Sequence, residues 1–207
     1  MILLRSNRAR GFTIIELLVV IAIIIVVAGL VVGLGGVATS SQRMKRAEAE
    51  RAKLITLIDA YKSKFGFYPP ARTNPAFSAT NTLLYELAGA KRVPSGPSAN
   101  PSFETKFITS SYTDLGALGI SGIYGIFNAP DDPTEVKHFL KNLKPDQYAS
   151  LAPGTLSLVV PVEGPGGKPN PWNYQTGANA TNNPASYDLW VDIIAGGKTV
   201  RIANWKE

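Results

Sequence analysis

One uninterrupted apolar segment constrains this chain more than any other feature. The 22 residues from Leu17 to Ala38 are drawn only from Leu, Val, Ile, Ala and Gly. A helix rises about 1.5 Å per residue, so a run of this length crosses the roughly 30 Å hydrocarbon core of a bilayer. A helix buried in a soluble domain, or a secretory signal peptide cleaved near Ala38, is a weaker interpretation because both use shorter runs. We therefore expect a transmembrane segment at about 17–38.

The charges on either side of this segment predict its orientation. The leader, residues 1–11, contains no acid. Its charges are three arginines, Arg5, Arg8 and Arg10. Basic residues stay in the cytoplasm, so the C-terminal part is expected across the membrane. A second basic cluster, Arg43, Lys45 and Arg46, lies beyond the run and weakens this prediction. The leader determines the predicted orientation, because it contains no acids and lies closer to the apolar segment.

Composition excludes several classes of site. The chain has no cysteine and one histidine, His138, which rules out disulfides, thiolate metal sites, cysteine nucleophiles and multi-histidine sites. No nucleophile or paired-carboxylate motif is present, and Asp131–Asp132 is better explained as a helix cap, so no enzyme is predicted. The net charge of +6 includes the three leader arginines, and acids alternate with bases elsewhere. No nucleic-acid partner is expected.

Glu16 is the one charge between Gly11 and Gln42. A carboxylate inside a bilayer costs about 2.5–3.5 kcal/mol, so it is usually paired and functional; at the headgroup level it costs little. Position alone leaves both readings open. If the chain were cut after Gly11, Phe12 would present an α-amino group one helical turn from Glu16. In an assembly, the amine of a neighbouring chain could meet the carboxylate instead.

Residues 10–17 read Arg-Gly-Phe-Thr-Ile-Ile-Glu-Leu and resemble the prepilin signature of type IV pilins and type II secretion pseudopilins. The resemblance implies that a prepilin peptidase cleaves between Gly11 and Phe12, and that Phe12 is N-methylated. It implies that Glu16 neutralises the terminal amine of an adjacent subunit during assembly. It also implies a filament of like subunits and other pseudopilins, an inner-membrane assembly platform, and a single-pass protein of the bacterial inner membrane whose C-terminal domain is periplasmic.

The apolar run continues into an amphipathic helix. Apolar residues recur at helical spacing along this stretch: Met44, Ala47, Leu54, Ile55, Ile58, Tyr61 and Phe65. Gly66 and the prolines after it end the helix. We expect one helix over Thr13–Phe65, about 80 Å long. The chain then divides into a leader (1–11), a long helix (12–65) and a globular domain (66–207). The predicted fold class is α+β and pilin-like: the membrane half protrudes, and the outer half packs on a small antiparallel sheet.

The globular part is predicted from local patterns. Two helices are expected, a short one at Thr82–Ala90 and one from an N-cap at Asp132 to about Leu143. Strands are expected at Ile123–Phe127, Leu156–Val162, Tyr187–Ile194 and Thr199–Ala203. The last two strands flank a Gly196-Gly197 turn that suits a tight hairpin. The stretch 163–186 is expected to be a surface loop region held by Trp172 and Tyr174.

The C-terminal part loosely resembles the major, G-type pseudopilins. The matching segments are Gly66-Phe67-Tyr68-Pro69, Pro171-Trp172-Asn173-Tyr174, Tyr187-Asp188-Leu189 and Ile202-Ala203-Asn204-Trp205. Those proteins often hold calcium after the Tyr-Asp-Leu segment. Asp188 and Asp192 share one face of a strand, so the resemblance implies calcium there, although Gly196-Gly197-Lys198 replaces the acid-rich loop. No other cofactor is expected.

Two functions follow. The first is a structural subunit of a type II secretion pseudopilus or type IV pilus-like filament, assembled after peptidase cleavage. The alternative is a single-pass, membrane-tethered periplasmic binding domain with an aromatic platform formed by Trp172, Trp190, Trp205 and the tyrosines. The mature N-terminus separates them, since only the filament subunit begins at a methylated Phe12.

Overall fold

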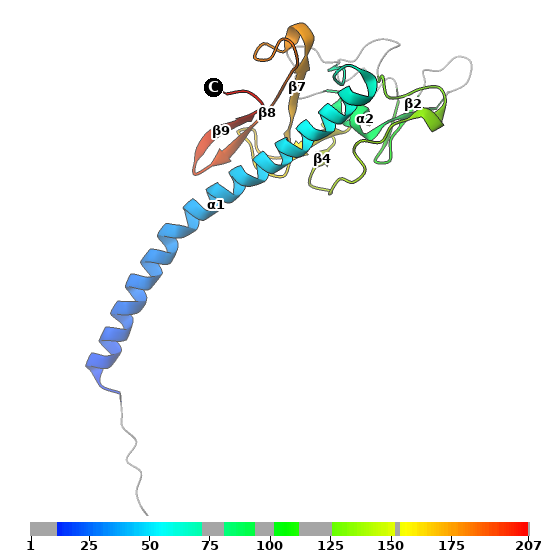
Figure 1. Cartoon of the computed structure of the whole chain (residues 1–207). Coiled ribbons are helices and arrows are strands. Elements are labelled where there is room, and N and C mark those ends of the chain that lie inside the picture. Colours follow the sequence, from blue (N-terminus) through cyan, green and yellow to red (C-terminus); the bar gives the residue numbers. More distant parts are fainter. Residues whose placement is uncertain (1–11, 72–80, 94–101, 112–125, 152–153, 207) are drawn as a thin grey trace, which may run out of the picture.

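A computed structural model describes residues 12–71, 81–93, 102–111, 126–151 and 154–206, with side chains given for all of these except 30–38, 110 and 111. A helix of 52 residues, α1 (Ile14–Phe65), is followed by a smaller mixed part (Figure 1). The elements after α1 are α2 (Leu83–Ala88), β1 (Lys91–Val93), β2 (Ser102–Glu104), β3 (Thr109–Ser111), η2 (Pro133–Glu135), β4 (Tyr148–Ala149), β5 (Ser157–Val160), β6 (Asn170–Pro171), β7 (Asn173–Thr176), η3 (Gly177–Asn179), β8 (Tyr187–Ala195) and β9 (Lys198–Ala203).

The helix α1 has a defined start and end. Thr13 is extended and caps the N-terminus, while Gly66 adopts φ 85° and donates its N–H to the carbonyl of Lys62. This left-handed end requires glycine, because other residues rarely reach that φ. The predicted helix over Thr13–Phe65 is confirmed, and its N-terminal half projects away from the globular part (Figure 1).

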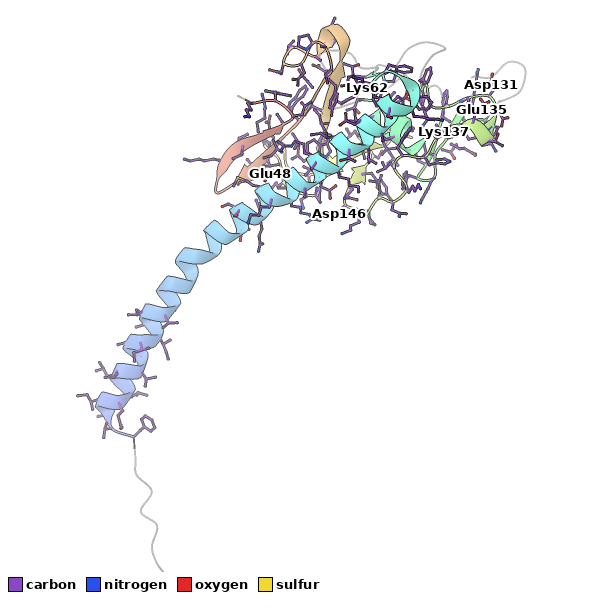
Figure 2. All side chains as sticks on the ribbon, viewed as in Figure 1. Glu48, Lys62, Asp131, Glu135, Lys137 and Asp146 are labelled. Atoms are coloured by element: carbon purple, nitrogen blue, oxygen red, sulfur yellow. The ribbon has the colours of Figure 1, made fainter. Side chains whose placement is uncertain are left out.

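The two halves of α1 face different surroundings. Ala47, Leu54, Ile58 and Tyr61 form a buried stripe on the outer half. Glu48 and Lys62 lie on the other faces of this half and are exposed (Figure 2). On the projecting half every described side chain is exposed, including Phe12 at 81% and Ile14 at 85%. An apolar surface of this kind requires a partner or a membrane.

The buried stripe of α1 packs on the last sheet of the chain. This sheet has the order β7-β8-β9 and is antiparallel throughout. Leu189, Val191 and Ile193 of β8 alternate along the strand and are fully buried. Together with Ile58 and Tyr61 they belong to one hydrophobic core. The predicted α+β class, a long helix followed by antiparallel sheets, is confirmed and is consistent with a pilin-like fold.

Two smaller antiparallel sheets complete the described part, β1-β2-β3 and β4-β5-β6. The short helix predicted at Thr82–Ala90 is present as α2, and all six of its residues are buried. The predicted hairpin is also present. Gly196 and Gly197 have φ of 61° and 74°, as a tight turn between β8 and β9 requires.

The helix predicted from Asp132 to about Leu143 is wrong. Asp132 does cap a turn by accepting from the N–H of Thr134, but the turn ends as η2 after three residues. Beyond it the backbone bonds to distant groups. Lys137 exchanges hydrogen bonds with the side chain of Asn128, and the N–H groups of 139 and 140 donate to the carbonyl of Leu87. These tertiary partners replace the i−4 carbonyls that a helix would use.

The strand predicted at Ile123–Phe127 is not confirmed. Residues 123–125 lie outside the described ranges, and Ile126 and Phe127 are not in a strand. The strand at Leu156–Val162 is present as β5. The stretch 163–186 is more ordered than predicted, because it contains β6, β7 and η3. Trp172 and Tyr174 are buried within it, so their predicted anchoring role is confirmed.

Candidate functional site

The first candidate site is the start of α1, where sequence analysis placed Phe12 and Glu16. Gly11 lies outside the described residues. Thr13 and Glu16 form a capping box. The N–H and the hydroxyl of Thr13 both donate to Glu16 Oε2 at 2.8 Å, and the N–H of Glu16 donates to Thr13 Oγ1 at 3.3 Å. The carboxylate therefore accepts from free donors at the helix start, where the helix dipole also favours negative charge.

This geometry places the Glu16 carboxylate beside the backbone of Phe12. Its oxygen contacts the N–H of Thr13, the next residue along the chain. An amine created at Phe12 would lie one residue further from the carboxylate than this N–H. The capping box was missed by sequence analysis, although Thr13-Ile14-Ile15-Glu16 matches the Thr-x-x-Glu pattern that predicts it.

The apolar surface next to this site extends along the projecting half of α1. The large apolar residues from Phe12 to Val27 are each 45% exposed or more. Within the described ranges, none of the helices combines the length and the hydropathy that a membrane crossing needs. The side chains of 30–38, which belong to the predicted segment at 17–38, lie outside the described set. The transmembrane segment stays a prediction.

The second candidate site is the pair Asp188 and Asp192 on β8. Asp188 is buried and accepts four hydrogen bonds, from the backbone and side-chain N–H groups of Asn182 and Asn183, at 2.9–3.0 Å. Asp192 accepts a two-point ion pair from Arg201 at 2.8 and 2.9 Å. Both carboxylates are therefore engaged by N–H donors.

These contacts bear on the predicted calcium site. Calcium takes six to eight oxygen ligands, which must present free lone pairs toward the ion. The donors around Asp188 and the guanidinium of Arg201 occupy that space. In the part of the chain that the structure describes, no group of three or more His, Cys, Asp or Glu could hold a metal. As arranged, the two aspartates do not fit calcium, and a calcium titration tests the site that the resemblance implied.

A buried carboxylate that sequence analysis missed is Glu86 of α2. It is fully buried and accepts from the hydroxyl of Tyr61 at 2.8 Å and from the N–H groups of Phe127 and Asn128 at 2.7 and 2.9 Å. Burial, and next the charge of Glu86, raise the pKa of the Tyr61 hydroxyl. The Glu86 carboxylate therefore joins three segments of the fold. The apolar neighbours Leu83, Leu84 and Leu87 were the one local sign of its burial.

The remaining candidates are structural. His138 is exposed, and its Nδ1 lies 2.7 Å from the carbonyl of Ala88. Trp172 is 2% exposed, so it cannot belong to a surface platform. Trp190 and Trp205 do contact each other, with ring centroids 5.6 Å apart. The three tryptophans are therefore not brought together as one aromatic face.

The comparisons with known proteins bear on the first site. The family model of the prokaryotic N-terminal methylation motif matches residues 6–32. This is the prepilin-type signature of type IV pilins and pseudopilins, so the resemblance found in residues 10–17 is confirmed. The match includes Gly11, Phe12 and Glu16. No curated protein and no solved structure matches the chain significantly.

Proposed function

We propose that this protein is a structural subunit of a filament related to type IV pili, assembled after a prepilin peptidase removes residues 1–11. The observation that carries the proposal is the methylation motif at 6–32, which coincides with the start of a long helix whose apolar side chains are exposed. The motif points to a filament-forming, membrane-anchored structural subunit rather than an enzyme.

The capping box supports a specific sequence of events. Before cleavage, Glu16 accepts from Thr13, so its charge is satisfied without a cation. Cleavage after Gly11 would add a positive amine on Phe12 within a turn of this carboxylate. Two opposite charges in a medium of low dielectric attract strongly, and each is costly when left alone. A neighbouring subunit that supplies the amine would therefore be held in one register.

The projecting half of α1 supplies the packing surface in this proposal. Apolar helices associate in a membrane through close van der Waals packing and polar pairs, and few side chains here are polar. The charge pair sets the register, and the apolar side chains supply the contact area. The globular part remains outside the helical bundle in this proposal, because the described core residues of α1 lie on its outer half, from Met44 onward.

Within this class we favour the type II secretion pseudopilus over the pilus. The loose resemblance of segments such as Pro171-Trp172-Asn173-Tyr174 to major pseudopilins supports this choice, as does the absence of cysteines for a disulfide-closed terminal loop. The proposal includes an inner-membrane location, a periplasmic globular domain, and like subunits, other pseudopilins and an assembly platform as partners.

The test compares Glu16→Gln with Glu48→Gln in cells that carry the assembly machinery. Glutamine keeps the size and hydrogen bonding of Glu16 but removes its charge. We expect both variants to be cleaved to a methylated Phe12 by mass spectrometry, and Glu16→Gln alone to lose most of its filament yield. Glu48 is a matched control because it is an exposed glutamate on the outer half of α1.

Two results would reject the proposal. Filament yield equal to that of the wild type in Glu16→Gln would remove the assembly role of its charge. An intact Met1 in the protein from its native host would remove peptidase processing, and would favour the membrane-tethered binding domain instead.

A further inference from the structure

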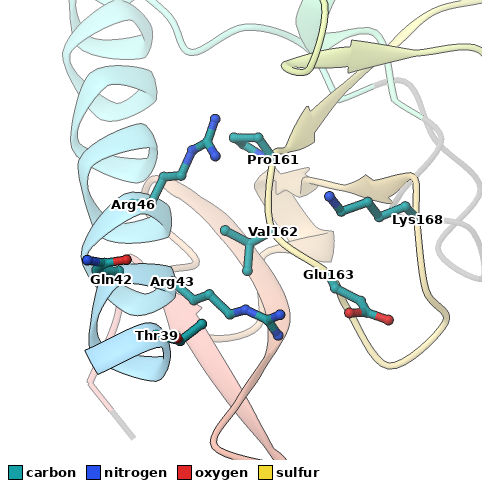
Figure 3. Close-up of a pocket in the computed structure, with 8 residues that line it drawn as sticks. All are labelled: Thr39, Gln42, Arg43, Arg46, Pro161, Val162, Glu163 and Lys168. Atoms are coloured by element: carbon teal, nitrogen blue, oxygen red, sulfur yellow. The ribbon is translucent and has the colours of Figure 1, made fainter. Parts of the chain in front are cut away.

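The groove between α1 and the Pro161–Lys168 segment is basic, and nothing in the filament proposal uses it. It has a volume of about 260 Å³ and is lined by Thr39, Gln42, Arg43, Arg46, Pro161, Val162, Glu163 and Lys168. The two arginines extend from α1, and Lys168 extends from the opposite wall toward the helix (Figure 3). Three cations and one carboxylate therefore surround a hollow of headgroup size, smaller than the pockets of drug-sized ligands.

The hydrogen bonds show which cations are available. Arg43 uses one guanidinium nitrogen, which donates to the carbonyl of Ile194 at 3.1 Å. Arginine has five N–H donors, so most of the donors of Arg43 remain available for a ligand. Lys168 makes no hydrogen bond or ion pair to any other described residue. Arg46 is paired with Asp146 at 2.6 Å, so its charge is largely compensated. Arg43 and Lys168 are thus the pair that can take an anion.

The position of the groove along α1 narrows the choice of anion. Arg43 follows the end of the predicted membrane segment, Ala38, by five residues, which is about 7.5 Å of helix. The headgroup layer on each side of the hydrocarbon core is of similar thickness, about 5–8 Å. A protein anchored by residues 17–38 therefore holds Arg43 at the level of the lipid phosphates. Lysine and arginine side chains near helix ends reach toward that layer.

We propose that this groove binds the phosphate of an anionic phospholipid, with Arg43 and Lys168 as its ligands. The guanidinium of Arg43 bonds two phosphate oxygens, and the ammonium of Lys168 bonds from the facing wall. This accounts for Arg43, the first residue of the basic cluster that follows the apolar run and opposes the orientation signal of the leader. The inference rests on the membrane anchoring in the proposed function and adds a ligand for the membrane-resident subunit.

The test uses the full-length protein in a mild detergent, with bound lipid counted by native mass spectrometry. Phosphatidylglycerol is offered in one arm and zwitterionic phosphatidylcholine in the other. We expect retention of phosphatidylglycerol over phosphatidylcholine. Arg43→Gln and Lys168→Gln should each reduce that retention roughly five-fold, as expected for one cation at an anionic surface. Lys64→Gln is the control, because this exposed lysine lies in the last turn of α1.

Each other outcome overturns the inference. Equal retention of the two lipids, or unchanged retention in Lys168→Gln, would show that the groove does not select an anionic headgroup. Lys168→Gln should leave the fold intact, since this side chain makes no hydrogen bond or ion pair with the described residues. Displacement of phosphatidylglycerol by millimolar inorganic phosphate would assign the groove to a soluble anion. Extraction of the protein from native membranes by alkaline carbonate would instead reject the anchoring itself.

Discussion

Tyr61 of α1 donates its hydroxyl to Glu86 of α2 at 2.8 Å, and both side chains are completely buried. The same carboxylate accepts from the backbone N–H groups of Phe127 and Asn128. One acidic side chain therefore ties the long helix, the short helix and a distant loop together. A buried carboxylate is costly unless it is hydrogen-bonded, so each of these donors contributes to stability.

The first prediction concerns this contact. Tyr61→Phe removes one donor from a buried carboxylate and should lower the free energy of unfolding by about 1–3 kcal/mol. Urea denaturation of the full-length protein in detergent measures the change. Tyr148→Phe is the matched control, because Tyr148 is half-buried and packs on Phe107. Equal stability of the two variants would contradict the assigned importance of the Tyr61–Glu86 bond.

The second prediction concerns alkaline pH. Burial is the main cause that raises the pKa of Tyr61, Tyr174 and Tyr187 above the ordinary value. The unfolded chain loses these protons near pH ~10, before the folded chain does. The contribution of these three tyrosines to the free energy of unfolding is therefore fully present below about pH 10 and is lost as the pH rises further. Tyr68 acts in the opposite sense, because a hydrogen bond with Lys62 lowers its pKa, but it is one partly exposed group.

Urea midpoints measured between pH 8 and about 11.5 check this dependence. Each tyrosine whose pKa is raised in this way contributes a decline of up to about 1.4 kcal/mol per pH unit. Tyr174→Phe should unfold more easily at neutral pH, because the bond from its hydroxyl to the carbonyl of Pro69 is lost. Its decline above pH 10 should nevertheless be less steep. A decline as steep as that of the wild type would contradict the role of Tyr174.

The third prediction concerns the end of α2. A Cβ on Gly89 would lie 2.5 Å from a methyl carbon of Val136 and 2.7 Å from the carbonyl of Lys137, and the φ of 74° is strained for alanine. Gly89→Ala should cost about 2–4 kcal/mol, judged from overpacking and left-handed strain together. Gly166→Ala is the control, because no atom of a described residue lies within 4 Å of its added Cβ. Thermal unfolding compares the two, and similar midpoints would contradict the prediction.

The fourth prediction concerns Asp188. Asp188→Ala should destabilise the protein by about 2–4 kcal/mol, because four N–H groups of Asn182 and Asn183 lose their acceptor. Millimolar calcium should leave the unfolding temperature of the wild type unchanged. A calcium-dependent rise in that temperature, lost in Asp192→Asn, would show instead that these carboxylates rearrange to hold the ion.

Local sequence determined the elements whose signals are contiguous. The stop at Gly66 and the turn at Gly196-Gly197 are predicted correctly, because each depends on a glycine that can adopt a positive φ. The prepilin-type signature is also local, since Gly11, Phe12 and Glu16 lie within one short segment. Its processing and assembly roles remain predictions that the sequence alone supports.

Tertiary structure decided the elements whose backbone groups bond to distant residues. Residues 136–143 follow a helical start signal at Asp132 but are not helical, because Asn128 and Leu87 take hydrogen bonds that a helix would need. Glu86 is buried because donors from α1 and from 127–128 converge on it. The groove beside Arg43 exists because residues 161–168, far along the chain, lie opposite α1. No contiguous sequence pattern encodes these long-range contacts, because their free energy arises only when separate segments pack together.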